Sequence, residues 1–359
     1  MCVRIAIVYN QPTYCRYNSA GEEAAVTGVF NAVDAVYYVL QELDYEMIRV
    51  PLAPPIEQAK EQLSKLGADL VFNLFEGFCG YPGTEAEIPD ILSALGMPYT
   101  GSPGAALSMA LDKVKTKIVL KSKGIDTPDF QLLDTSEIAA FYLKYPCIIK
   151  PPAEDASHGL SEKSVVYDLA SLSEQLADLQ SNYSGKALVE EFINGREFNI
   201  TVMGNSRGTT LPVSEIEYSL PQGKPRILTF AAKWQPDSLY YRGTRVICPA
   251  EIGDKDLKQI TEVALAAFSL LGCRGYARVD MRLDDRGRLY VIEVNPNPDI
   301  SPGSGAVRQA EAAGLTYTQF IKKIVELAME KENEESQHPA DGKGRQASLD
   351  GDITEYARI

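Results

Sequence analysis

Strand-like and helical segments alternate along the first hundred residues of the chain. Apolar, β-branched runs and helical patterns cover residues 3–8, 29–43, 47–50, 56–66 and 69–74 in turn, starting with a strand. Strands that alternate with helices are typical of a parallel sheet with helices packed on its faces. The sequence therefore predicts an N-terminal α/β domain, residues 1–105, built on a Rossmann-like parallel sheet.

The rest of the folded part has an α+β order, in which strands and helices do not alternate regularly. A helical pattern over residues 105–123 opens a central unit, residues 106–186. A third unit, residues 187–331, contains several strand-like runs and ends in a helical pattern. Beyond it the apolar content collapses, which predicts a disordered tail over residues 332–359.

The composition excludes several classes of protein. Of the 359 residues, 45% are hydrophobic and 23% are charged, and the formal net charge is −14. An acidic chain repels nucleic-acid backbones and anionic membranes, so we expect neither as a partner. The chain starts with a strand-like run instead of a signal peptide, and it has no apolar stretch of about 20 residues. We therefore expect a cytoplasmic protein.

Histidine and cysteine usage narrows the chemistry further. The chain has only two histidines, which argues against a histidine-based triad or a histidine-ligated metal. Six cysteines are scattered without a CxxC pair or a ligand spacing. We expect them to be small buried or inert thiols.

A predicted β-hairpin near the C-terminal end carries the strongest candidate site. Residues 275–283 and 288–296 read as two strands joined by a DDRG turn. Because side chains alternate between faces along a strand, one face carries Arg278, Asp280, Glu293 and Asn295, and the other carries Val279, Met281, Ile292 and Val294. Two carboxylates and an amide suit Mg²⁺ that also binds substrate phosphates. The alternative is a solvent-facing hairpin with a cross-strand ion pair.

Other charged residues recur beside predicted strand ends and loops. Lys150 ends a buried strand, where an ammonium needs an anionic partner, and the loop after it contains Gly159. EEFINGREF reads as a hairpin of two strands with a turn at Asn194 and Gly195, and Glu190 and Glu197 lie on either side of the turn. Lys113 and Lys233 complete the set of basic candidates. Taken alone, the two glutamates, Lys113 and Lys233 are also explained as solvated surface charges.

Five segments, taken together and in this order, resemble the ATP-grasp superfamily, and within it the D-alanine–D-alanine ligase group. They are MPYTGSPGAALSMALDK, YPCIIKPPAEDASHG, VEEFINGREF, LGCRGYARVD and LYVIEVNPNPD. The resemblance extends from residue 3 to about residue 328. It implies an ATP-grasp fold, in which ATP lies between two α+β subdomains behind an N-terminal pre-ATP-grasp domain.

The resemblance also implies a role for each candidate residue. In the nucleotide site, Lys113 and Lys150 would hold phosphates, Glu190, Glu191 and Ile193 would contact adenine, and Glu197 would bond the ribose. Asp280, Glu293 and Asn295 would hold two Mg²⁺ ions, for which Mn²⁺ can substitute. Lys233 would close over the nucleotide, and Arg278 would face the oxyanion of a tetrahedral intermediate. The implied reaction is ATP-driven carboxylate–amine ligation through an acyl phosphate.

Several positions depart from the family pattern on the substrate side. Glu76 stands where the group usually has histidine, Ala156 followed by Ser157 where it has a catalytic serine, Trp234 where it has tyrosine, Asp299 where it has glycine, and Gly305, after the matched Ser304, where leucine is common. Glu23 matches the acid that binds the first substrate's amine, with a shifted spacing. Added acids favour a cationic group, so we expect an amino acid or short peptide other than the D-alanine pair.

Three other readings stay open at this point. One is a genuine D-alanine–D-alanine ligase that tolerates these substitutions. Another is a non-catalytic nucleotide-binding scaffold, although such proteins tend to lose the metal ligands that this chain retains. A third is a carboxylase or phosphotransferase with the same ATP site. The expected partners are small-molecule substrates, and the resemblance suggests a homodimer through the N-terminal domain.

Overall fold

A computed structural model of the chain describes residues 3–11, 28–79, 81–153, 157, 159–183, 185–205 and 207–330. Glu23, Ala156 and the tail predicted over 332–359 lie outside these ranges. Within them, no helix is both long and apolar enough to cross a bilayer.

The N-terminal part contains the predicted parallel sheet, with strand order β2-β1-β3. Its elements are β1 (Arg4–Asn10), α3 (Val29–Glu42), β2 (Glu46–Leu52), α4 (Ile56–Ser64), β3 (Leu70–Leu74) and α5 (Thr84–Ala94). In β1, Ile5 and Ile7 pack with α3, whereas Ala6 and Val8 pack in a second core with α4 and α5. Both faces of the sheet are therefore covered, as a parallel sheet requires.

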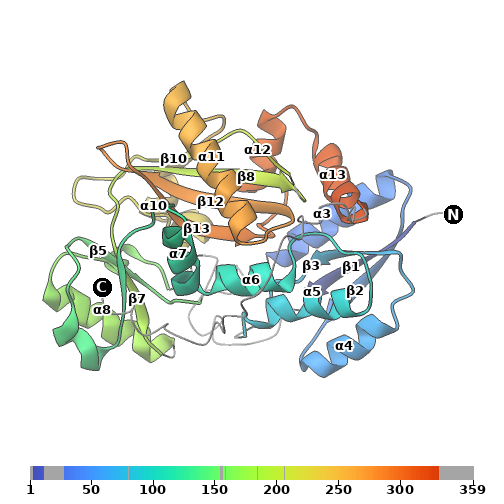
Figure 1. The fold of residues 1–359 in the computed structure, drawn as a ribbon, viewed down its shortest axis with the longest axis horizontal. Coiled ribbons are helices and arrows are strands. Elements are labelled where there is room, and N and C mark those ends of the chain that lie inside the picture. Colours follow the sequence, from blue (N-terminus) through green and yellow to red (C-terminus); the bar gives the residue numbers. More distant parts are fainter. Residues whose placement is uncertain are drawn as a thin grey trace, which may run out of the picture. The chain divides into compact units, whose positions relative to one another are not determined.

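A helix from the far end of the chain also packs on this sheet. Helix α13 (Tyr317–Met329) shares a core with α3 and with one face of the sheet, and Figure 1 shows it beside α3. Phe320, Ile321 and Ile324 of α13 are fully buried there. The end of the folded chain is thus fixed to its beginning.

The central part is a four-stranded antiparallel sheet in the order β4-β7-β5-β6. It follows α6 (Gly104–Leu111) and α7 (Lys113–Ser122), and its elements are β4 (Phe130–Leu133), η1 (Thr135–Ala140), β5 (Cys147–Lys150), η2 (Glu162–Ser164), β6 (Val165–Val166), α8 (Leu169–Asn182) and β7 (Ala187–Glu191). Leucines of α8 fill the core against the inner side chains of β5 and β7. The sheet therefore extends through Glu191, past the boundary predicted at residue 186.

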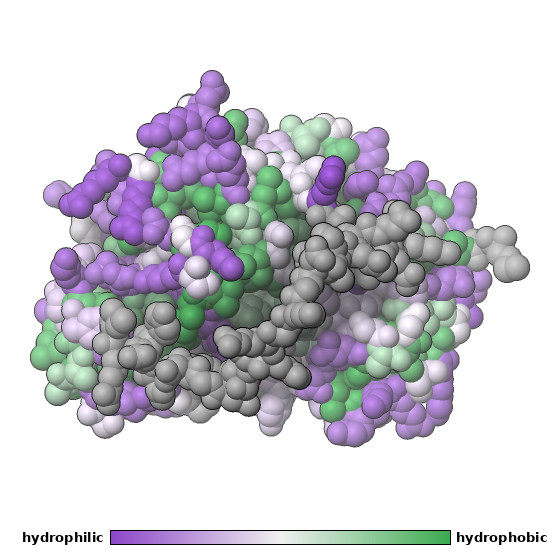
Figure 2. Space-filling view, in the orientation of Figure 1, coloured by the Kyte–Doolittle hydropathy of each residue, from purple (hydrophilic) through white to green (hydrophobic). Residues whose placement is uncertain are grey.

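The C-terminal part is an antiparallel sheet in the order β11-β10-β8-β12-β13, with β9 paired to β8. Its elements are β8 (Arg196–Gly204), β9 (Gly208–Thr210), β10 (Ser214–Tyr218), α9 (Phe230–Trp234), α10 (Leu239–Arg242), β11 (Thr244–Ile247), α11 (Asp254–Leu270), β12 (Gly275–Leu283), β13 (Leu289–Pro296) and α12 (Gly305–Ala312). Helix α11 packs on one face of the sheet. Figure 2 shows hydrophobic side chains gathered over the region of α7 and α11, with hydrophilic ones along the margin. The opposite face carries Met203 and Tyr276, which pack in a core with α12 and α13, and next to them the polar residues of the site.

Four details of the sequence interpretation are corrected. The helix predicted over 105–123 is two helices, because Asp112 leaves the helical conformation and caps α7 by accepting from the Lys115 amide at 3.0 Å. Strands β7 and β8 belong to different sheets, so EEFINGREF is a junction between sheets and not a hairpin. Cys79 forms a disulfide bond and is therefore not an inert thiol.

The fourth correction concerns the apolar face of the β12–β13 hairpin. The register shifts by one residue between Asp280 and Met281, where Met281 pairs with Val291. Ile292 is the extra residue, and it is only half-buried, whereas Val291 is fully buried. A bulge of this kind turns a neighbouring side chain, here that of Glu293, toward a new direction.

Candidate active site

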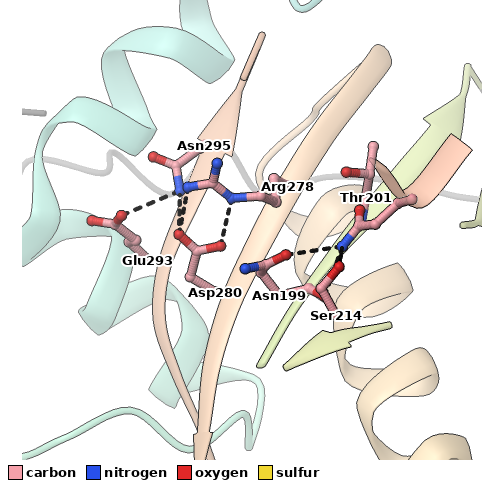
Figure 3. Close-up of polar contacts among 8 residues, drawn as sticks. Asn199, Thr201, Ser214, Arg278, Asp280, Glu293 and Asn295 are labelled. Carbon is pink, nitrogen blue, oxygen red and sulfur yellow. Dashed lines mark hydrogen bonds and ion pairs between the residues drawn. The ribbon is translucent and has the colours of Figure 1, made fainter. Parts of the chain in front are cut away.

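The hairpin places the four predicted polar residues on one face of the sheet. Arg278 pairs with Asn295 across the strands, and Asp280 pairs with Glu293. Asn295 Nδ2 donates to Asp280 Oδ2 at 3.0 Å and to Glu293 Oε1 at 3.3 Å (Figure 3). The predicted metal ligands are therefore neighbours, and side chains of two adjacent strands fix their positions.

Glu293 is the point on which the predicted basic residues converge. Burial raises its pKa, but four positive charges outweigh burial and lower the pKa to about 2. These charges belong to Lys113, Lys150, Lys233 and Arg278. They come from α7, β5, α9 and β12, which are distant in the sequence. The fold thus brings three lysines together around one carboxylate, whereas the sequence identified each of them only as a separate candidate.

The acids of this site form a crowded pair. Arg278 donates from Nε and Nη2 to the two oxygens of Asp280, both at 2.7 Å. Burial raises the pKa of Asp280; Arg278 lowers it, and the charge of Glu293 raises it again. Two partly buried carboxylates that repel each other are stabilised by the nearby charge of Arg278.

Mg²⁺ fits this donor set. Two carboxylates and an amide are oxygen ligands of the kind that Mg²⁺ takes when substrate phosphates complete its shell. Within the described ranges, no group of three or more His, Cys, Asp or Glu side chains is placed to hold a metal. Asp280 and Glu293, with the amide oxygen of Asn295, would supply part of a coordination shell that substrate phosphates complete.

Glu190 lies in a second buried cluster. Lys117 Nζ lies 2.7 Å from Glu190 Oε1, and Lys150 Nζ lies 2.8 Å from Glu190 Oε2. Burial lowers the pKa of Lys117 to about 8, although Glu190 acts to raise it. Burial raises the pKa of Glu190, and the two lysines reverse this and lower it. Lys117 is missing from the sequence prediction, because nothing in KVKTK distinguishes it from its exposed neighbours.

Glu197 is held in a network next to the sheet junction. Tyr218 donates to its Oε2 at 2.6 Å, and the Arg282 guanidinium bonds the same oxygen. Arg282 also donates to the carbonyl of Ile193 at 2.9 Å, while the amide of Glu191 donates to the carbonyl of Asp129. The predicted adenine and ribose residues therefore follow one another along the strand junction, and one Glu197 oxygen has no bond to these partners.

Lys233 and Trp234 lie on the short helix α9, which is fastened to the loop after β5. Ser157 Oγ donates to the carbonyl of Leu228 at 3.1 Å, and the amide of Phe230 donates to the carbonyl of Leu160 at 3.1 Å. Burial and the charge of Arg278 lower the pKa of Lys233. The loop after β5 and the segment that carries Lys233 are thus bonded to each other.

A buried polar network supports the site from the neighbouring strands. Gln309 of α12 donates to the carbonyl and the Oδ1 of Asn199, both at 2.9 Å, and to Ser214 Oγ at 3.1 Å. Its Oε1 accepts from the Thr201 amide at 2.9 Å. Asn199 pairs directly with Asp280 in the sheet (Figure 3). Gln309 was not predicted, since its partners lie about a hundred residues away.

The start of α12 presents unpaired donors next to Arg278. Ser304 Oγ and Arg308 Nε are buried and have no hydrogen-bond partner among the described residues. The backbone of Gly305 leaves space beside Arg278, since a Cβ there would lie 3.9 Å from the arginine side chain. Burial and the charge of Arg278 lower the pKa of Arg308. This corner can bind an anion, and Arg308 is a further residue that the sequence analysis missed.

Two of the remaining predicted substrate residues, Asp299 and Glu76, lie near Tyr276 of β12, and the charge of Asp299 also acts to raise the pKa of Arg278 and of Arg308. Asp299 accepts from the amide and hydroxyl of Ser301 at 2.8 and 2.7 Å. Its charge, like that of Glu76, acts on the hydroxyl of Tyr276, two residues before Arg278 on β12. Trp234 packs near Phe230, with ring centroids 6.3 Å apart.

The chain is similar to known proteins over most of its length. A family model described as D-ala D-ala ligase C-terminus matches residues 119–326. A protein called y4sG from Sinorhizobium fredii is 34% identical over 72% of this chain and 74% of its own. The D-alanine–D-alanine ligase of Pelotomaculum thermopropionicum is 31% identical over 83% of this chain and 91% of its own.

Two solved structures have the same fold. The D-alanine–D-alanine ligase of Bacillus anthracis complexed with ATP superposes with a TM-score of 0.69 and 22% identity, and the match covers 91% of this chain and 97% of that one. The VanG D-Ala:D-Ser ligase of Enterococcus faecalis superposes with a TM-score of 0.71, also at 22% identity, over 91% of this chain and 100% of that one.

Proposed function

This chain belongs to the D-alanine–D-alanine ligase family of ATP-grasp enzymes, which are ATP-dependent ligases that form C–N bonds, and we propose that it joins a carboxylate to an amine, through an acyl phosphate, on an amino acid or short peptide other than the D-alanine pair. The proposal has two parts. The ATP-dependent ligation follows from the family and from the polar face of the hairpin. The departure from D-alanine follows from the residues on the substrate side of Arg278.

The observation that carries the first part is the set of charges around Glu293. A buried carboxylate whose pKa is lowered to about 2 by three lysines and an arginine is ionised at any physiological pH. The same cations are available to the phosphates of a nucleotide, which carry negative charge that spreads during phosphoryl transfer. Stabilising this charge is most of what a protein contributes to the reaction.

The proposed roles of the individual residues are those that the family resemblance implies, and their positions support them. Lys113 and Lys150 hold phosphates, with Lys150 fixed by Glu190, and Glu197 offers its oxygen to the ribose. Lys233 enters from α9 when the bonded loops close. Asp280, Glu293 and Asn295 would hold Mg²⁺, which supplies charge neutralisation on the phosphates when it is bound.

The bond-forming step belongs to Arg278. The carboxylate substrate attacks the terminal phosphate of ATP, which gives an acyl phosphate and ADP; the amine then attacks the acyl carbon, and phosphate leaves. Arg278 keeps its guanidinium in place through two bonds to Asp280. From there it faces the oxygen that becomes negative in the tetrahedral intermediate. Ser304 and Arg308 offer donors to a carboxylate on the amine substrate.

The second part rests on charge. Glu76 and Asp299 place carboxylates where the family resemblance leads us to expect histidine and glycine. These acids favour a substrate with a cationic group at this position over one with a neutral methyl group. The enzyme would thereby discriminate between substrates that undergo the same ligation reaction. The assembly into a homodimer through the N-terminal domain stays a prediction.

A phosphate-release assay over pairs of amino acids and dipeptides tests both parts. The purified protein with MgATP should release phosphate only when a carboxylate and an amine substrate are present, and mass spectrometry should find an amide product. Robust D-alanine-dependent release with D-alanyl-D-alanine as product would refute the second part and support the alternative, a genuine D-alanine–D-alanine ligase. A phosphorylated or carboxylated product without an amide would refute the first part.

A further inference from the structure

A small cavity opens at one end of the polar face, beside the segment that follows β13. It is lined by α3, the end of β3 and the loop after it, α5, β12 and residues 297–300. Counted as the space that the centre of a water molecule can reach, its volume is about 20 Å³. One water needs roughly 10–15 Å³ by this measure, so the cavity accepts one or two groups of that size.

Three carboxylates line this cavity: Glu76, Glu85 and Asp299. Tyr276, which is 1% exposed, lines the cavity with them; Glu85 is partly buried, and Glu76 and Asp299 are exposed to solvent. Burial raises the pKa of Tyr276, and the negative charges of Asp299, Glu76 and Glu85 raise it further. Glu76 and Glu85 also have interactions of their own. The negative potential of the cavity favours a cation, and its size fits an ammonium group better than a guanidinium.

Two side-chain amide groups near the carboxylates have buried nitrogen atoms that lack a hydrogen-bond acceptor among the described residues. Asn73 is 2% exposed and lines the cavity; its Oδ1 accepts from the Phe75 amide at 3.2 Å, but its Nδ2 has no acceptor among the described residues. Asn297 repeats this pattern, with Oδ1 bonded to the Ser102 amide at 2.7 Å and Nδ2 without an acceptor there. A buried donor without an acceptor is costly. The guest should therefore bring an oxygen as well as an ammonium.

The spacing of residues along β12 gives an estimate of the distance between this cavity and the reacting centre. Tyr276 and Arg278 lie on the same face of β12, two residues apart, which corresponds to about 7 Å along a strand. An extended chain covers about 1.2 Å per bond. The ammonium and carboxyl carbon of an α-amino acid, two bonds apart, are therefore too close together to reach both places. Five or six bonds are needed.

We propose that the carboxylate substrate carries a primary ammonium group five or six bonds from its reacting carboxyl carbon, and that the cavity of Glu76, Glu85 and Asp299 binds this ammonium. The inference rests on the proposed ligase function, since Arg278 marks the reacting carboxylate only in that reaction. Dipeptides and ω-amino acids share this chemistry. A dipeptide in addition has a carbonyl oxygen that can accept from Asn73 and Asn297.

A ladder of ω-amino acids tests the proposed spacing. Glycine, 3-aminopropanoate, 4-aminobutanoate, 5-aminopentanoate and glycylglycine are supplied with MgATP, and hydroxylamine replaces the unknown amine so that any acyl phosphate is trapped as a hydroxamate. The KM should be lowest for 5-aminopentanoate or glycylglycine, and about tenfold or more below that of pentanoate, which lacks the ammonium. A KM that is lower for glycylglycine than for 5-aminopentanoate would indicate that Asn73 and Asn297 bind the peptide carbonyl oxygen.

The same ladder separates failure of this inference from failure of the proposed function. Hydroxamate formation that is best with glycine, or indifferent to chain length, overturns the cavity assignment and leaves the ligase function intact. Thermal stabilisation of the full-length protein by the ladder, measured with MgADP, needs no turnover. Stabilisation that peaks at five bonds without any hydroxamate supports the cavity and overturns the ligase function.

A matched pair of variants on α5 completes the test. Glu85 lines the cavity, whereas Glu87, two residues further along the same helix, is exposed and does not line it. Glu85→Gln should raise the KM for 5-aminopentanoate about tenfold and leave the KM for pentanoate unchanged. Glu87→Gln should change neither. An equal effect of Glu85→Gln on both carboxylates would reduce Glu85 to a structural role and overturn the assignment.

Discussion

The buried cluster of Lys117, Glu190 and Lys150 allows a quantitative prediction about stability. Two ammonium nitrogens lie 2.7 and 2.8 Å from opposite oxygens of one carboxylate, and all three side chains are at most 7% exposed. At an effective dielectric constant of about 20, each contact corresponds to about 6 kcal/mol of Coulomb attraction. Glu190→Gln keeps the shape of the side chain, removes both attractions and leaves two ammonium groups buried together.

In the variant, one of the two lysines can lose its proton, and this limits how far the free energy of unfolding falls. Burial already lowers the pKa of Lys117 from 10.5 to about 8, and without the charge of Glu190 it falls further. The wild-type lysine, with a pKa of about 8, already forgoes about 2.5 of the roughly 3.5 pH units of protonation that a lysine neutral at pH 7 forgoes, so its neutralisation adds about 1 pH unit, or about 1.4 kcal/mol, to the loss. Lys150 loses its partner as well, and we expect Glu190→Gln to lower the free energy of unfolding by about 3–5 kcal/mol at pH 7, the range seen when a buried pair loses one partner.

The pH dependence has a definite sign. In the variant the folded pKa of Lys117 lies far below its unfolded value, so the unfolded chain binds more protons and stability rises with pH until about 10.5. In the wild-type protein this rise starts only near pH 8. The deficit of the variant should therefore shrink between pH 7 and pH 8.

Equilibrium urea unfolding at these two pH values measures the effect. Lys117→Met is the matched control, because it removes one charge of the same cluster and leaves Glu190 paired with Lys150; its loss should be clearly smaller. A loss for Glu190→Gln no larger than that for Lys117→Met, or a deficit that does not change with pH, would refute the electrostatic reasoning.

Four further outcomes are expected. Glu293→Ala should abolish ATP-dependent phosphate release with an unchanged circular dichroism spectrum, and retained turnover would remove the hairpin from the mechanism. Arg278→Ala should slow amide formation about 10²-fold in single-turnover assays, and an unchanged rate would leave it a structural partner of Asp280. EDTA should stop phosphate release, and added Mg²⁺ or Mn²⁺ should restore it. Gln309→Leu should lower the free energy of unfolding by about 2–4 kcal/mol in urea, because the Thr201 amide loses its acceptor; a neutral effect would mean that water replaces it.

The hairpin was predictable because its geometry depends on neighbouring residues alone. A strand places every second side chain on one face, and a short turn aligns the faces of its two strands. Arg278, Asp280, Glu293 and Asn295 therefore had to meet if the hairpin formed, and they do. The one error on it, Ile292, comes from a bulge, which inserts a residue without any mark in the sequence pattern.

The rest of the site depends on contacts that no local pattern encodes. Lys117 lies 73 positions before its partner Glu190, and Gln309 lies 95 positions after its partner Ser214. A helical pattern shows that one face of α7 is buried, but it does not show that Glu190 of β7 contacts this face. The same reason explains why EEFINGREF was read as a hairpin: adjacency in sequence favours pairing, whereas β7 and β8 each find a better partner in a separate sheet.

The two sides of Arg278 have opposite electrostatic character, and this bears on how substrates are told apart. Toward Tyr276 lie the carboxylates of the cavity, and toward α12 lie the unpaired donors of Ser304 and Arg308. Both the carboxylate substrate and the amine substrate of a peptide ligation carry an ammonium and a carboxylate, so size alone cannot assign each to its place. On the proposed function, a negative cavity on one side would retain the substrate whose ammonium lies far from its reacting carboxylate, and the donors on the other side would retain the carboxylate of the substrate that attacks. Exchanging the two substrates would then bring like charges together, so we expect this charge arrangement to favour one of the two carboxylates for activation.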